Sequence, residues 1–77
     1  MISGKLYSYG IARRIYSESK GTEQIGEIEG NEPFLFLGDT VRLKWVETFK
    51  VLSSKGIVGW IQVGYPEDLK AYDETNV

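Results

Sequence analysis

Residues 51–61 read VLSSKGIVGWI, and this stretch carries the clearest indication of the fold. Two short runs rich in β-branched residues flank the link from Ser53 to Gly56, where a hairpin turn needs a residue with a positive φ. A second glycine, Gly59, comes directly before Trp60. A strand glycine of this kind lets another backbone approach closely or lets the strand bend. The stretch therefore predicts an antiparallel hairpin whose second strand turns a corner of a curved sheet.

The rest of the chain has the same pattern of brief extended runs punctuated by glycine, of which there are nine in all. Apolar, β-branched or alternating runs predict strands at 5–9, 13–16, 24–29, 34–37, 41–45, 49–52 and 57–61. In a chain this short, closing such strands into a barrel removes exposed sheet edges without a second sheet. We expect the barrel interior to include Val41, Leu43, Val51 and Ile61.

Local signals mark the connections between these runs. A glycine bulge near Gly26 is expected, because Ile25 and Ile28 are otherwise out of phase. Turns are expected at 31–33 and 37–39. One short 3-10 or helical turn is predicted over 66–69, because Pro66 stands at the start of this segment, where a helix tolerates proline. Trp45 is expected in an extended run, on the same face as Val41 and Leu43.

The composition limits the function. The 77 residues suffice for one domain, expected over 1–72, with 1–11 as an added strand or arm and 73–77 as a disordered tail. With no cysteine or histidine, disulfides and thiolate metal sites are excluded, and we expect neither cofactor nor enzyme activity. The net charge of −2 counts against a nucleic-acid partner. No signal-peptide or membrane-length apolar run occurs, so we expect a cytoplasmic protein without membrane contact.

Four segments in order resemble the bacterial SH3 family: RIYSES at 14–19, IGEIEG at 25–30, FKV at 49–51 and GIVGWI at 56–61. The last of these matches the family's G-x-x-G-W-[IV] ending in full. The resemblance implies an all-β fold, a small SH3-like β-barrel of five to six antiparallel strands. It also implies a domain that binds a protein or peptide, or a cell-wall glycan.

The chain is rich in aromatic residues, with two Trp, five Tyr and three Phe. Phe34, Phe36 and Phe49 are assigned to the core. An aromatic groove for a peptide is the functional interpretation of the others. The candidate apolar contacts are Tyr7, Tyr9, Tyr16, Trp60 and Tyr65.

Acidic residues follow the first candidate strands. Glu18, Glu23 and Glu27 are candidates for an acidic rim that selects basic peptides, although a solvated loop explains the same charges. Three alternatives to a peptide-binding module stay open. The chain could be a small structural subunit of a larger complex, possibly of phage or host-takeover origin, or it could bind cell-wall glycan. It could also bind nucleic acid through a phosphate-binding stripe of Arg13, Arg14, Arg42, Lys44 and Lys50.

Overall fold

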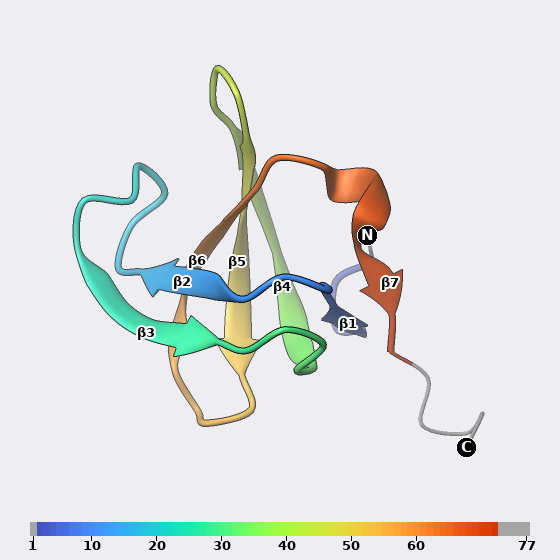
Figure 1. The fold of residues 1–77 in the computed structure, drawn as a ribbon. Coiled ribbons are helices and arrows are strands. Elements are labelled where there is room, and N and C mark those ends of the chain that lie inside the picture. The colour runs from blue at the N-terminus through green and yellow to red at the C-terminus, as the bar shows by residue number, and fades with distance from the viewer. Residues whose placement is uncertain (1, 73–77) are drawn as a thin grey trace.

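The computed structural model describes residues 2–72, which form seven strands and one turn of 3-10 helix (Figure 1). No α-helix occurs in this part of the chain, so the prediction of an all-β protein is confirmed. The predicted disordered tail at 73–77 lies outside the described residues. The elements are β1 (Leu6–Ser8), β2 (Arg13–Tyr16), β3 (Gln24–Ile28), β4 (Phe34–Arg42), β5 (Glu47–Ser53), β6 (Val58–Val63), η1 (Pro66–Asp68) and β7 (Lys70–Ala71).

All neighbouring strands pair antiparallel in one curled sheet, in the order β3-β2-β6-β5-β4-β1-β7. Figure 1 shows β2 and β3 crossing in front of the β5–β6 hairpin, so the sheet curls back over its own face. The described residues give seven strands where five to six were predicted. The additional pairing comes from the two ends of the described chain, because Tyr7 of β1 faces Ala71 of β7 and also faces Phe34 of β4.

The inner face of the curled sheet forms the hydrophobic core. Phe34, Phe36 and Phe49 are all buried, as predicted. The core also takes in two tyrosines and five aliphatic side chains that exclude solvent completely or nearly so, namely Tyr7, Tyr9, Ile15, Ile28, Val51, Ile61 and Val63. Burial of apolar area at about 25 cal/mol per Å² makes this cluster the main favourable contribution to folding.

Of the four residues predicted to lie in the barrel interior, two are buried. Val51 and Ile61 are fully buried, but Val41 is 37% exposed and Leu43 is only partly covered. The reason lies in the β4–β5 hairpin, which extends beyond the curled part of the sheet (Figure 1). Side chains near its tip have no opposite wall to pack against.

The predicted hairpin at 51–61 is present as β5 and β6. Leu52 faces Val58 across the pair, and Gly56 in the turn has φ of 85°. The Ser53 hydroxyl accepts hydrogen bonds from the backbone N–H groups of Lys55 (3.2 Å) and Ile57 (3.1 Å). Serine and a left-handed glycine thus satisfy the turn locally, which explains why the sequence signal was sufficient.

The predicted bulge near Gly26 is also confirmed. Ile15 faces Gly26, but the next residue, Tyr16, faces Gln24, so Ile25 has no partner in the ladder. The 66–69 turn is present as η1. At the predicted 31–33 turn, Asn31 has φ of 66°.

Two predictions in the middle of the chain are wrong, namely the turn at 37–39 and the extended run at 41–45 that includes Trp45. The 37–39 segment does not reverse the chain, because β4 continues through it with a bulge at Gly38, whose φ is 102°. The reversal comes later, at Lys44 and Trp45, where the Leu43 N–H bonds the Val46 carbonyl at 2.9 Å. A glycine with positive φ serves a bulge as well as a turn, so the sequence signal did not distinguish them.

Strands β2 and β6 approach each other closely at Gly59. A Cβ atom at this position would meet the side chain of Ile15 and would lie 2.7 Å from the Tyr16 carbonyl oxygen. Only glycine therefore fits here, as expected from its place before Trp60. This contact brings the β2–β3 hairpin onto the rest of the sheet.

Candidate functional site

Two of the predicted contact tyrosines belong to the core. Tyr7 is 7% exposed and Tyr9 is 5% exposed. The Tyr7 ring meets Phe36 edge-on at 6.5 Å between centroids, and its hydroxyl accepts a hydrogen bond from the Ile2 N–H at 2.5 Å. Their burial gives both rings a packing role and leaves little surface for an external ligand.

Two other predicted residues, Tyr16 and Trp60, are brought together. They face each other across β2 and β6, and Lys50 of β5 faces Trp60 from the other side. All three side chains are partly buried, and they form one row across three strands. Tyr65 stands apart from this row, directly before η1, with 64% of its surface exposed.

Glu18 organises the loop between β2 and β3. Its carboxylate accepts hydrogen bonds from the N–H groups of Lys20 (3.0 Å) and Thr22 (2.5 Å) and from the Thr22 hydroxyl (2.8 Å). These donors, the Thr22 N–H first and its hydroxyl second, lower the pKa of Glu18. A carboxylate engaged in this way has a local structural role, whatever else it contacts.

We expect replacement of Glu18 by alanine to loosen this loop. The folded-state pKa of Glu18 is depressed, so its ordering effect is present above the ordinary carboxylate pKa and is lost as the pH falls through the lowered value. The protection factor of the Thr22 amide, which is the measured exchange rate corrected for the pH dependence of intrinsic exchange, should fall in Glu18→Ala at neutral pH and in the unchanged chain at acid pH. Glu23→Ala is the matched control, because the Glu23 side chain is exposed. Equal Thr22 protection factors in all three proteins at neutral pH would contradict this role.

The three predicted glutamates lie at different points of the β2–β3 hairpin, with Glu18 and Glu23 in its loop and Glu27 in β3. Glu23 is exposed directly before β3, whereas Glu27 lies within that strand and faces Arg14 of β2. Glu27 also lines a surface pocket together with two arginines. The charge around Glu27 is therefore mixed, and its contact with a basic ligand stays a prediction.

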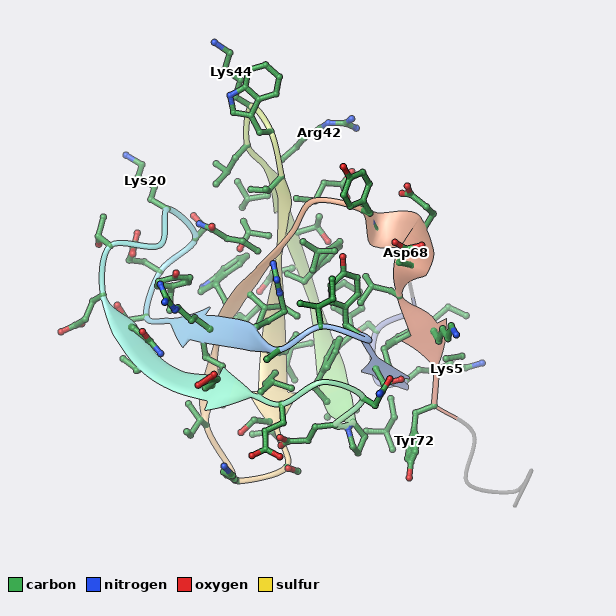
Figure 2. The ribbon with its side chains drawn as sticks, in the orientation of Figure 1. Lys5, Lys20, Arg42, Lys44, Asp68 and Tyr72 are labelled. Atoms are coloured by element: carbon green, nitrogen blue, oxygen red, sulfur yellow. The ribbon has the colours of Figure 1, made fainter. Side chains whose placement is uncertain are left out.

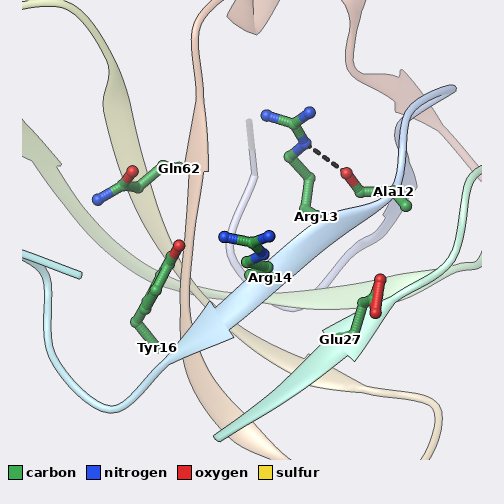
Figure 3. A pocket seen from close by; sticks show the side chains of 6 residues that line it. All are labelled: Ala12, Arg13, Arg14, Tyr16, Glu27 and Gln62. Carbon is green, nitrogen blue, oxygen red and sulfur yellow. Dashed lines mark hydrogen bonds between the residues drawn. The ribbon is translucent and has the colours of Figure 1, made fainter. Parts of the chain in front are cut away.

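A surface pocket lies beside Glu27. Its volume is about 400 Å³, and its walls come from β2, β3, β6 and the residue before β2 (Figure 3). The lining residues are Ala12, Arg13, Arg14, Tyr16, Glu27 and Gln62. We refer to it as the arginine pocket.

A second candidate surface lies at the tip of the β4–β5 hairpin, where Figure 2 shows Lys44 at the outermost end of the molecule. Trp45 is 81% exposed there, and the Lys44 Nζ lies 5.4 Å from the centroid of its ring. A groove of about 150 Å³ runs from this tip to Gly64 and Pro66 at the start of η1. We call this region the hairpin-tip surface.

Sequence reasoning missed Trp45 as a site residue. It placed Trp45 in a strand, because Val41, Leu43 and Trp45 alternate correctly and the reversal has no glycine, proline or asparagine. The available signal was Arg42 and Glu47, which pair across the hairpin at 3.5 Å and frame the four-residue link. Opposite charges at that spacing are too common to identify a turn.

Within residues 2–72, no three carboxylate, histidine or cysteine side chains gather where they could hold a metal ion. The same residues include no helix long and apolar enough to cross a membrane. Comparison of the chain with models of known families, with curated proteins and with solved structures finds no match. Its fold and surfaces define it as a small all-β protein with one curled antiparallel sheet.

Proposed function

We propose that this protein is a non-catalytic binding module with an SH3-like barrel, and that its partner is a protein or peptide. The observation that carries the proposal is Trp45, which stands 81% exposed at a hairpin tip beside a groove. The curled sheet, the close approach at Gly59 and the 3-10 turn before β7 support the SH3-like part.

Large aromatic side chains are usually buried, and contact hot spots are enriched in Trp, Tyr and Arg. The hairpin-tip surface presents Trp45, and Tyr65 is 64% exposed on the segment that borders the groove. Pro66 supplies a rigid apolar wall to the same groove. A peptide could place one apolar side chain in the groove and stack a second on the Trp45 ring. Such binding would remove both the groove and the ring from water.

The occupant that fits best is an extended segment with closely spaced apolar side chains. The groove, at about 150 Å³, is small, so it accommodates one side chain and not a folded surface. The ammonium group of Lys44 lies 5.4 Å from the centroid of the Trp45 ring, a cation–π contact that favours one orientation of the ring. Proline-rich peptides meet these requirements with little loss of entropy on binding.

Screening a synthetic library of proline-rich and control peptides by NMR tests this proposal. We expect binders to shift the Trp45 indole N–H signal, and Trp45→Ala to weaken binding by about 30-fold or more, as loss of an interface hot spot does. Val58→Ala is the matched control, because Val58 is 49% exposed at the start of β6 and does not line the groove. Peptides that bind equally well to Trp45→Ala, or a library without binders, would count against the proposal.

A further inference from the structure

The arginine pocket holds more positive charge than its protein partners neutralise. Arg13 and Arg14 line it with a single carboxylate, that of Glu27. Glu27 faces Arg14 across the β2–β3 ladder, yet in residues 2–72 the only ion pair closer than 4 Å is that of Arg42 with Glu47. The pocket therefore carries a net positive charge, in a chain whose overall charge is −2.

Arg13 makes two contacts that orient its side chain and do not use its terminal N–H groups. Its Nε donates to the Ala12 carbonyl at 2.7 Å, and its guanidinium carbon lies 5.6 Å from the centroid of the buried Tyr9 ring. Figure 3 shows the two terminal nitrogens of Arg13 pointing away from this hydrogen bond. An arginine ordered in this way loses little entropy when an anion binds its free fork.

The remaining walls add polar groups that suit an oxyanion. Tyr16 lines the pocket from the same strand as the arginines and can donate from its hydroxyl. Gln62 lines it from β6, with its amide nitrogen 3.4 Å from the Lys20 carbonyl oxygen. The lining thus brings together two guanidinium groups and a phenol, which are the donors that bind phosphate oxygens well.

The structure also separates these arginines from two other basic residues of the predicted stripe, Arg42 and Lys44. Arg42 pairs with Glu47 and Lys44 lies over Trp45, both at the hairpin tip. Figure 2 shows Arg42 and Lys44 at the far end of that hairpin. A compact pair of cations matches one doubly charged group and not a long polyanion.

We propose that the arginine pocket binds the phosphate group of a phosphorylated small molecule. A phosphate monoester carries close to two negative charges at neutral pH, enough to match both arginines. The pocket, at about 400 Å³, is larger than one phosphate and leaves room for the organic part. This site is separate from the hairpin-tip surface, because it shares no lining residue with the groove beside Trp45.

NMR titration at constant ionic strength tests the proposal, with inorganic phosphate, O-phosphoserine and acetate as the probes. We expect saturable shifts of the Arg13 and Arg14 side-chain N–H signals with both phosphates, and weaker binding of acetate. Tighter binding of O-phosphoserine than of inorganic phosphate identifies the ester as the ligand class. Acetate binding as tightly as either phosphate, or inorganic phosphate binding at least as tightly as the ester, would overturn the assignment.

Matched variants complete the experiment. Arg14→Ala should weaken O-phosphoserine binding by roughly tenfold or more, as loss of a charged hydrogen-bond donor does. Glu27→Gln should tighten it several-fold by removing the competing carboxylate. Arg42→Ala and Trp45→Ala should leave it unchanged, so failure of the peptide proposal would not affect this one. Equal losses in Arg14→Ala and Arg42→Ala would show non-specific attraction and refute the site.

Discussion

Phe36→Ala is expected to lower the free energy of unfolding by about 3–5 kcal/mol, the usual cost of removing a buried aromatic ring. Phe36 is 4% exposed and lies between two other rings. Tyr7 meets it edge-on at 6.5 Å, and Phe49 does so at 5.9 Å. The substitution would therefore leave a cavity at the centre of the aromatic cluster and remove two favourable ring contacts.

Such a loss is a large share of the whole free energy of unfolding, because folded proteins are stable by only about 5–15 kcal/mol. Urea denaturation followed by circular dichroism measures it. Trp45→Ala removes a larger ring at a site that is 81% exposed, so its stability should change by only about 0.5 kcal/mol. If both substitutions cost the same, the assignment of Phe36 to the core and of Trp45 to the surface would be wrong.

Gly59→Ala is expected to cost about 2–3 kcal/mol, although it adds only one methyl group. The new Cβ would meet the Ile15 side chain and would lie 2.7 Å from the Tyr16 carbonyl oxygen. Ile15 is fully buried and the Tyr16 oxygen belongs to the backbone, so neither can move aside cheaply. We expect β2 to separate from β6, with faster amide exchange throughout the β2–β3 hairpin.

Gly64→Ala is the matched control for this substitution. No atom lies within 4 Å of a Cβ at Gly64, and the position is exposed. The stability of this variant should stay the same or rise slightly, because alanine restricts the unfolded chain. If Gly59→Ala were no less stable than Gly64→Ala, the close approach of β2 to β6 would not be a constraint on the fold.

The two candidate surfaces have a common origin in the way the core is filled. The core uses three phenylalanines and five aliphatic side chains together with Tyr7 and Tyr9, and it does not need Trp45 or Tyr65. Aromatic rings left outside a small core are available for contact with partners. The arginines of the pocket are on the outside for a different reason, since burial of an unpaired guanidinium is costly.

Local sequence signals predicted those parts of the fold whose geometry is satisfied within a few residues. The β5–β6 turn closes on Ser53 and Gly56, η1 begins at Pro66, and the bulge at Ile25 follows from one phase change in the apolar pattern. The core assignment of the three phenylalanines was correct for a related reason, because such side chains are buried in almost any small fold.

The candidate site was predicted less well. Tyr16 and Trp60 were both chosen, and the structure makes them neighbours. Tyr7 and Tyr9 were chosen too, but exposure of a tyrosine depends on which strand covers it. Trp45 was missed because a regular alternating pattern ran through a chain reversal.

By itself, the sequence determined that the protein is made of short strands, where several of them turn, and which chemistry its residues exclude. These properties depend on backbone preferences and composition, which act over a few residues. Tertiary structure alone decided that β1 and β7 pair, that Trp45 stands in solvent and that Arg13 and Arg14 share a pocket with Gln62. The β1–β7 pair and the pocket depend on contacts between segments far apart in the chain, which the curl of the whole sheet closes. Trp45 is exposed because its hairpin extends beyond that curl, which no local pattern shows.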